Sequence, residues 1–185
     1  MKIDPNRTWK MVEQRMAGET DPTRRRNLEL VLRHMKAEAR ADIDGVIATL
    51  CARPRYRTHA RPDEDYLNPD GSPQAVREFY DLTIVQTGAF RLEFEVDRVI
   101  VDDDAVFTEG IMRMAYPGST LALMEIEVDE PEAFYVAQTR MGIVWPVDSS
   151  EGKLVGEETY SGVDAFAGIA ERKITLADIV PLEED

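Results

Sequence analysis

The chain has 185 residues, of which 43% are hydrophobic and 31% charged, a composition that suits one globular domain with its own core. Acidic residues outnumber basic ones by 36 to 22, and the net charge of −14 disfavours binding to nucleic acids or anionic membranes. One cysteine, Cys51, and two histidines are too few for a disulfide or a typical zinc site, and no nucleotide-binding motif occurs. We therefore expect no metal and no cofactor. The N-terminus has no hydrophobic signal region and no apolar run has the length of a membrane span, which predicts a cytoplasmic protein.

Apolar residues recur at helical spacing in four segments of the first half of the chain. The predicted helices cover residues 5–18, 22–39, 42–50 and 72–87. Gly18 is typical of a helix end, whereas Asp21-Pro22 and Ser72-Pro73 are typical of an N-cap followed by the first helical residue. A proline-rich loop over residues 60–73 leads into the last of these helices.

Alternating apolar residues predict strands in the second half of the chain. They are expected over residues 91–102, 105–116, 133–147 and 153–160, after a short first strand at 54–59. The alternation changes phase at Asp97-Arg98, which predicts a β-bulge there. Residues 121–128 fit a strand or a helix about equally well, and Thr175 with Asp178 is typical of a short capped turn.

Three motifs stand in order along these elements. They are HMKAEARADID at residues 34–44, AVREFY at 75–80 and GKLVGEETY at 152–160. The motifs and their order resemble the nuclear transport factor 2-like superfamily, and the last motif resembles the closing strand of its SnoaL-like branch. The resemblance implies one domain over residues 1–185, with a core at 28–162, an N-terminal helical extension at 1–20 and a C-terminal tail at 163–185.

The same resemblance implies an α+β cone, in which N-terminal helices pack on a strongly curved, mixed or antiparallel sheet that encloses an apolar pocket. Members of the superfamily include ketosteroid isomerase, polyketide cyclases, scytalone dehydratase and limonene epoxide hydrolase, and other members bind or associate without catalysis. The resemblance also implies a homodimer formed through the sheet. Because one fold can carry many functions, the site has to be argued from its residues.

Three residues are candidates for proton-transfer chemistry. His59 lies close to where the resemblance places a catalytic aspartate, and an imidazole can act as a general base near neutral pH. Glu109 would have a raised pKa if its side of the strand faces an apolar pocket, and Arg140 could stabilise developing negative charge. The alternatives are an exposed histidine at the loop entrance and outer-face ion pairs for Glu109 and Arg140. His34 is expected to be structural or exposed.

Aromatic and methionine side chains are expected to line a pocket for a small hydrophobic molecule, although such residues also form ordinary cores. The candidates are Tyr56, Tyr80, Phe94, Met112, Tyr135, Trp145 and Tyr160. Of the adjacent Glu157 and Glu158, strand alternation predicts that one points inward and the other meets solvent.

Three functions fit these features. The first is a cofactor-independent isomerase, cyclase, dehydratase or epoxide hydrolase that transfers protons on a small, hydrophobic, cyclic substrate. The second is a non-catalytic module that binds a small molecule, and the third is a homodimeric association domain. Titratable side chains that converge in a cavity would favour the first, a cavity without them the second, and a filled core with a dry dimer interface the third.

Overall fold

Helices form the first part of the chain, as the sequence predicted. In the computed structural model, which describes residues 1–183, they are the 3₁₀ helix η1 (Pro5–Arg7), α1 (Lys10–Ala17), α2 (Pro22–Ala39) and α3 (Ile43–Thr49). Asp21 caps α2 by accepting hydrogen bonds from the amides of Thr23 and Arg24, and Asp42 caps α3 through the amide of Gly45. These caps satisfy amide groups that the first turn of a helix leaves unpaired.

A mixed segment connects α3 to the main strands. It contains the short strand β1 (Arg57–Thr58), the 3₁₀ helix η2 (Asp65–Leu67), α4 (Pro73–Tyr80) and the π-helix η3 (Asp81–Val85). Ser72 caps α4 by accepting a hydrogen bond from the amide of Ala75, as predicted. The strand expected over residues 54–59 is confirmed only in part, because β1 has two residues.

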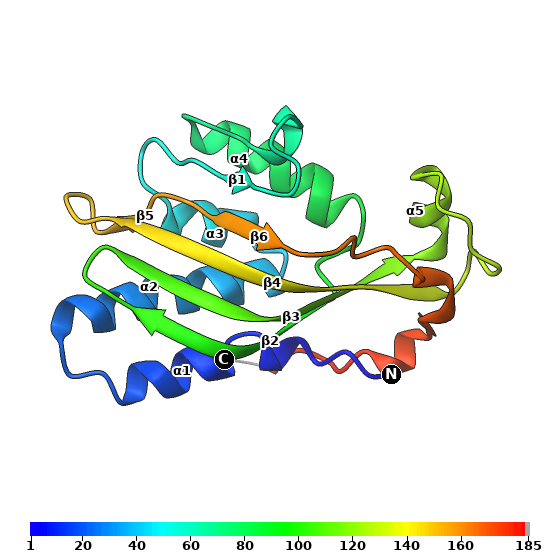
Figure 1. Cartoon of the computed structure of the whole chain (residues 1–185), viewed down its shortest axis with the longest axis horizontal. Helices are drawn as coiled ribbons and strands as arrows, with labels where there is room; N and C mark the ends of the chain where they lie inside the picture. The colour runs from blue at the N-terminus through cyan, green and yellow to red at the C-terminus, as the bar shows by residue number, and fades with distance from the viewer. Residues whose placement is uncertain (184–185) are drawn as a thin grey trace.

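Six further strands complete a seven-stranded mixed sheet. They are β2 (Leu92–Val101), β3 (Ala105–Pro117), β4 (Phe134–Asp148), β5 (Lys153–Leu154), β6 (Glu158–Ser161) and β7 (Lys173–Ile174). The order across the sheet is β1-β6-β4-β3-β2, β5 and β7 pair with β4, and β1 runs parallel to β6. Figure 1 shows β2, β3 and β4 crossing the molecule with α2 and α3 behind them. Within residues 1–183 the edge strands β1 and β2 do not pair, so the predicted α+β fold is confirmed with an open sheet.

The predicted β-bulge in β2 is confirmed. The register of β2 against β3 shifts between Val96 and Arg98, which leaves Asp97 as the extra residue. Leu92, Phe94 and Val96 are buried before the shift, and Val101 is buried after it. The bulge therefore keeps apolar residues on the inner face although their sequence parity changes.

Of the two alternatives left open for residues 121–128, the strand is not present. The chain leaves the sheet after Pro117 and forms the helix α5 (Gly118–Leu123), so the helical alternative holds for the start of that segment. Gly118 permits the turn, because a Cβ there would lie 2.7 Å from the carbonyl oxygen of Glu130. Leu121, fully buried, anchors α5 on the core.

The two faces of the sheet have different coverings. The helices pack on the inner face, where even positions of β3 and odd positions of β4 join the main core. On the outer face, Ile3, Ala115, Val136 and Ile174 form a second, small core. Ile3 bridges to Ile179, so the N- and C-terminal segments run side by side over this end of the sheet (Figure 1).

The segment expected as a C-terminal tail is therefore packed against the sheet. It contributes β7 and the 3₁₀ helices η4 (Ile169–Glu171) and η5 (Leu176–Asp178). The turn predicted at Thr175 and Asp178 is present as a capping box at the start of η5. Among the helices of residues 1–183, none is long and apolar enough to cross a membrane.

Candidate active site

Glu109 and Arg140 lie on the outer face of the sheet. The Nε of Arg140 donates to Glu109 Oε1 at 2.9 Å, and its two terminal nitrogens reach the carboxylate of Asp97 at 3.0 and 3.1 Å. Arg98 pairs with the other Glu109 oxygen at 3.1 Å. The interior placement considered for Glu109 and Arg140 is therefore wrong, because odd positions of β3 and even positions of β4 point outward. The outer-face ion pair, the alternative, is what the structure shows, and a catalytic role for either residue stays a prediction.

His59 and Tyr160 share the outer face at the edge formed by β1 and β6. Their rings stack with centroids 4.1 Å apart, and His59 Nε2 lies 3.9 Å from Glu158 Oε2. The side chain of His59 is 44% exposed and Tyr160 is 45% exposed, so Tyr160 does not line the interior as predicted. The structure does not bring His59 into one interior cavity with Glu109 and Arg140, and its catalytic role also stays a prediction.

The other predicted wall residues all lie in the interior. Tyr56, Tyr80, Phe94, Met112, Tyr135 and Trp145 are buried. Tyr56, Phe79 and Tyr80 pack together with ring centroids 5.1 to 6.0 Å apart, and Trp145 meets the ring of His34 edge-on at 5.4 Å. An aromatic region therefore surrounds one part of α2, although the role of these residues in binding a ligand stays a prediction.

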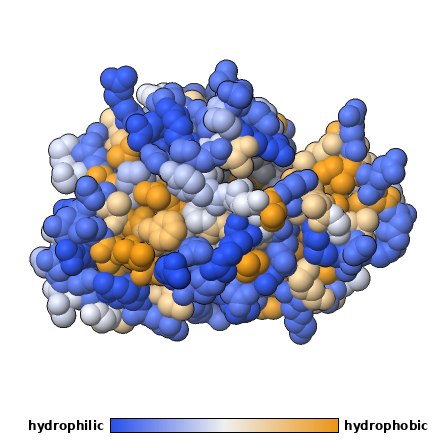
Figure 2. Space-filling model, in the orientation of Figure 1, coloured by the Kyte–Doolittle hydropathy of each residue, from blue (hydrophilic) through white to orange (hydrophobic). Residues whose placement is uncertain are grey.

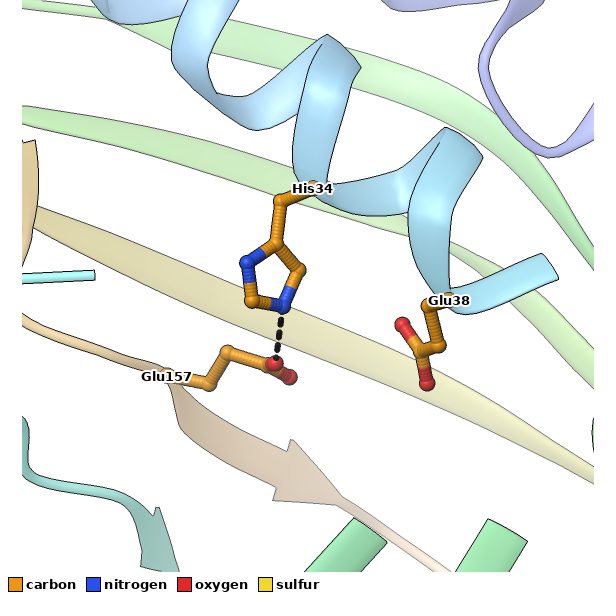
Figure 3. A group of neighbouring side chains, drawn as sticks. All are labelled: His34, Glu38 and Glu157. Carbon is orange, nitrogen blue, oxygen red and sulfur yellow. Dashed lines mark hydrogen bonds and ion pairs between the residues drawn. The ribbon is translucent and has the colours of Figure 1, made fainter. Parts of the chain in front are cut away.

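A polar cluster lies at the centre of this aromatic region. His34 on α2 is fully buried, with its Nδ1 2.7 Å from Thr49 Oγ1 and its Nε2 3.1 Å from Glu157 Oε1. The hydroxyl of Tyr80 lies 3.0 Å from the same Nε2 and donates to Glu157 Oε1 at 2.7 Å. Figure 3 shows the bond between His34 and Glu157, with Glu38 beside them. We name His34, Glu38, Glu157 and Tyr80 the proton cluster.

Glu38 is the exceptional member of the proton cluster. One oxygen of its carboxyl group lies within 4.8 Å of a ring nitrogen of His34 and a carboxyl oxygen of Glu157, yet Glu38 has no hydrogen-bond or ion-pair partner within residues 1–183. Every fully enclosed side-chain nitrogen or oxygen of these residues does have a hydrogen-bond partner. The unpartnered oxygens of Glu38 therefore border space that a water-sized molecule can reach.

The surroundings of Glu38 favour its neutral form. Burial, and then the neighbouring carboxylate of Glu157, raise the pKa of Glu38 to about 8. Burial and Glu157 also raise the pKa of Tyr56 and Tyr80 well above its usual value. At neutral pH the protonated carboxyl of Glu38 thus lies in a region where the phenols of Tyr80 and its neighbour Tyr56 are also neutral.

Two features of the sequence bring the cluster together. His34 and Glu38 are four residues apart on α2, so both lie on one side of the helix. Glu157 turns inward at a bulge, since three steps along β4 from Val147 to Val144 face four steps from Leu154 to Glu158. Glu158 points outward, where Arg55 binds it at 3.0 Å. The prediction that the two glutamates diverge is therefore confirmed.

His34, Glu38 and Glu157 could hold a divalent ion, because each offers one ligand atom and these atoms lie within 4.8 Å of one another. In the arrangement seen, Glu157 has hydrogen-bond partners in Tyr80 and His34, and the raised pKa of Glu38 favours its protonated form at pH 7. Hydrogen bonding and protonation thus account for both carboxyl groups.

His34 was expected to be structural or exposed and Glu38 was assigned no role, although the sequence carries a signal for both. Leu30, Val31 and Met35 mark the buried side of α2, and His34 and Glu38 continue the same stripe at helical spacing. Two titratable residues one turn apart on an apolar stripe need partners in the core. Thr49 gave no comparable signal, because its contact with His34 depends on how α3 packs on α2.

Two surface depressions lie away from the proton cluster. One is formed by the loop after α5, including Ala122, Ile126, Val128 and Pro131. The other lies beside His59 and includes Arg57 and Asn68. Neither depression includes a residue of the proton cluster.

Comparison with known proteins gives the fold and no closer relationship. No protein-family profile and no curated protein sequence matches the chain. In contrast, 235 solved chains share its structure, so the fold is a common one that does not by itself define an activity.

Three of these structures illustrate the range of proteins that share the fold. A Shewanella putrefaciens protein assigned as a SnoaL-like polyketide cyclase has a TM-score of 0.64 at 11% identity, over 88% of this chain and 92% of its own. TerC, co-crystallised with polyporic acid, has a TM-score of 0.57 at 15% sequence identity, and the match covers 79% of this chain and 98% of TerC. A Mycobacterium tuberculosis protein in complex with estradiol-17beta-hemisuccinate has a TM-score of 0.56 at 13% sequence identity. The match covers 80% of this chain and 98% of that protein. The chain therefore has the SnoaL-like form of the nuclear transport factor 2-like fold, as its motifs predicted.

Proposed function

We propose that the protein is a cofactor-independent enzyme that transfers a proton on a small, hydrophobic, cyclic molecule bound beside α2. The observation that carries this proposal is the carboxyl group of Glu38, which is unpartnered within the described chain, borders accessible space and has a pKa of about 8. A carboxyl group whose pKa lies near the working pH can both give and take a proton. The aromatic region around it suits an apolar substrate.

The proton cluster also supports a division of roles. Glu157 accepts a hydrogen bond from Tyr80 and lies 3.1 Å from His34 Nε2, whereas Glu38 has no such partners within the described residues. Two carboxyl groups in unlike surroundings are typical of an acid and a base that act on one substrate. Glu38 is thus the proposed proton donor, and Glu157 with His34 the proposed acceptor.

Hydrogen–deuterium exchange at carbon would test this proposal. A panel of cyclic ketones and enones is incubated with the protein in deuterated buffer, and loss of the C–H signal is followed by ¹H NMR. We expect enzyme-dependent exchange on at least one compound, about 10²–10⁴-fold slower in the Glu38→Gln variant. Glu158→Gln is the matched control, because Glu158 follows Glu157 directly but points outward. Exchange that Glu38→Gln leaves intact would contradict the role of Glu38, and exchange abolished by a chelator would contradict cofactor independence.

The second candidate is a protein that binds a small molecule without converting it. It is supported by the two structures above that were solved with polyporic acid and with a steroid ester. In that case the proton cluster would orient the ligand by hydrogen bonds. Saturable binding of a panel compound, with no deuterium exchange in either the wild type or the variants, would favour this function over catalysis.

Two broader expectations also continue as proposals. We propose a cytoplasmic location, which fractionation of cells that express the full chain would test. We also propose a homodimer that forms through the exposed part of the outer sheet face, and its residues are argued in the Discussion.

A further inference from the structure

We infer that Thr49 is a positioning residue, which fixes the tautomer of His34 and thereby the place of the proton shared with Glu157. The inference rests on the proposed function for its catalytic meaning, but the hydrogen-bond pattern that carries it can be measured without any substrate. Thr49 is hydrogen-bonded to His34 and Val46, and it has no hydrogen bond to Glu38 within residues 1–183.

The argument begins with the single hydrogen of the Thr49 hydroxyl. Thr49 Oγ1 lies 2.6 Å from the carbonyl oxygen of Val46, within the same helix. A carbonyl oxygen can only accept, so the hydroxyl hydrogen is used there. Thr49 Oγ1 is also 2.7 Å from His34 Nδ1, and in that contact it can only accept. His34 Nδ1 must therefore carry a hydrogen.

The other side of the imidazole is then constrained as well. The hydroxyl of Tyr80 donates to Glu157 Oε1, so it offers only a lone pair to His34 Nε2 at 3.0 Å. Glu157 Oε1 lies 3.1 Å from the same nitrogen. A second proton is required in this contact, either on Nε2 as part of an imidazolium or on the Glu157 carboxyl. The chain from Val46 through Thr49 to His34 thus assigns one proton to the His34–Glu157 pair.

This assignment matters for Glu38 because of charge. The titratable groups that face the pair are Glu38 on the same helix, Tyr80 from α4 and Tyr56 from the segment before β1. Of these, only Glu38 changes charge near neutral pH. While the His34–Glu157 pair holds its proton, the pair is neutral overall and repels an ionised Glu38 less than an isolated carboxylate would. Removing the acceptor for Nδ1–H favours neutral His34 with its hydrogen on Nε2, which leaves Glu157 as an uncompensated anion.

NMR of ¹⁵N-labelled histidine would test the inference directly. The chain has only two histidines, and the exposed His59 can be replaced by His59→Gln so that every signal belongs to His34. In this background we expect a protonated Nδ1 from pH 5 to pH 9. Thr49→Val should remove that signature and give the Nε2–H tautomer, whereas Thr49→Ser, which keeps the hydroxyl, should restore it.

A second readout links the tautomer to Glu38. The titration midpoint of Glu38, followed by ¹³C NMR of its carboxyl carbon, should rise by about one pH unit in Thr49→Val because a like charge is exposed beside it. Thr49→Ser should keep the wild-type midpoint. An Nδ1–H signature retained in Thr49→Val, or a wild-type His34 in the Nε2–H form, would overturn the inference. If Thr49→Val fails to fold, the wild-type and Thr49→Ser spectra still decide, since both must show Nδ1–H.

These outcomes are separate from those of the proposed function. The tautomer is read on the protein alone, so absence of deuterium exchange on every panel compound would leave the positioning role intact. Conversely, two results together would support the proposed function and reject the role of Thr49. These are deuterium exchange that depends on Glu38, and a His34 tautomer that Thr49→Val does not change.

Discussion

A carboxyl group with a pKa of about 8 in the folded protein, as for Glu38, makes stability depend on pH. In the unfolded chain a glutamate loses its proton near pH ~4.3, so between that pH and about 8 the folded state holds a proton that the unfolded state has lost. The stabilisation from this proton is complete below the unfolded pKa and is lost as the pH rises through the folded pKa.

The corresponding prediction concerns Glu38→Gln. Urea unfolding at pH 5, 6, 7 and 8 should show the wild type losing stability relative to the variant, by at most about 1.4 kcal/mol per pH unit. Glu158→Gln should keep the wild-type slope, because Glu158 is on the outer face. Parallel curves for the wild type and Glu38→Gln would show that Glu38 titrates normally in the folded state.

Tyr80 is expected to contribute to stability through its hydroxyl group. Tyr80→Phe removes the bond to Glu157 Oε1 and leaves a buried carboxylate with one donor fewer, which should cost about 1.5–3 kcal/mol. Tyr160→Phe is the matched control, since Tyr160 is 45% exposed and should change stability by less than about 0.5 kcal/mol. Chemical denaturation at pH 7 measures both, and equal effects would mean that the Tyr80 hydroxyl is not needed to satisfy Glu157.

At the scale of elements, the bulge between β5 and β6 decides where Glu157 points. Gly156 has φ 145°, and a Cβ there would lie 2.1 Å from the carbonyl oxygen of Arg55. Gly156→Ala should therefore destabilise the protein by about 2 kcal/mol or more, because backbone would have to move. Gly162→Ala should have little effect, since nothing lies within 4 Å of a Cβ at that position.

Gly156→Ala also tests whether the bulge matters for the proposed reaction as well as for stability. If the bulge positions Glu157, Gly156→Ala should slow deuterium exchange even at temperatures where the protein is folded by circular dichroism. Unchanged exchange in folded Gly156→Ala protein would mean that another feature orients Glu157.

Local signals in the sequence explain why many elements could be predicted. Asp21-Pro22 and Ser72-Pro73 begin helices because cap and first residue act within one turn. The phase change at Asp97 marks the bulge because strand alternation has a period of two. By contrast, residues 121–128 have spacings that fit both periods, and the close approach of Gly118 to Glu130 is a tertiary contact that no local spacing indicates.

The candidate site was harder to predict, for a physical reason. Alternation shows which residues of a strand share a face, but not which face meets the helices. Glu109 and Arg140 were considered for the interior, yet they point outward. His34, Glu38 and Glu157 come from a helix and a distant strand, and only tertiary packing brings them within 4.8 Å.

At the scale of the whole molecule, the two faces of the sheet are suited to different tasks. The inner face carries the proton cluster under the helices, whereas the terminal segments cover only part of the outer face. The uncovered part presents a row across three strands in which Ile100 pairs with Phe107 and Phe107 with Val144. Ile100 is 56% exposed, and Figure 2 shows apolar surface towards the left, where β2 ends and β3 begins.

This row is where we expect a second copy of the chain to bind. Apolar side chains flanked by charged ones, here Arg98, Glu109 and Arg140, give the apolar centre and polar rim of a typical interface. Size-exclusion chromatography with light scattering should show a dimer for the wild type. Ile100→Asp would bury an unpaired charge in that centre, so it should weaken dimerisation at least about tenfold.

Leu176→Asp provides the control, because Leu176 is 61% exposed but lies in η5, away from the row. Both variants replace an exposed aliphatic side chain by aspartate, so a general effect of added negative charge on a chain of net charge −14 would appear in both. A monomeric wild type at all concentrations, or a dimer equally weakened by both substitutions, would reject the outer sheet face as the interface. A dimer lost only in Ile100→Asp, with Glu38-dependent exchange retained, would show that association and the proton cluster use opposite faces of one sheet.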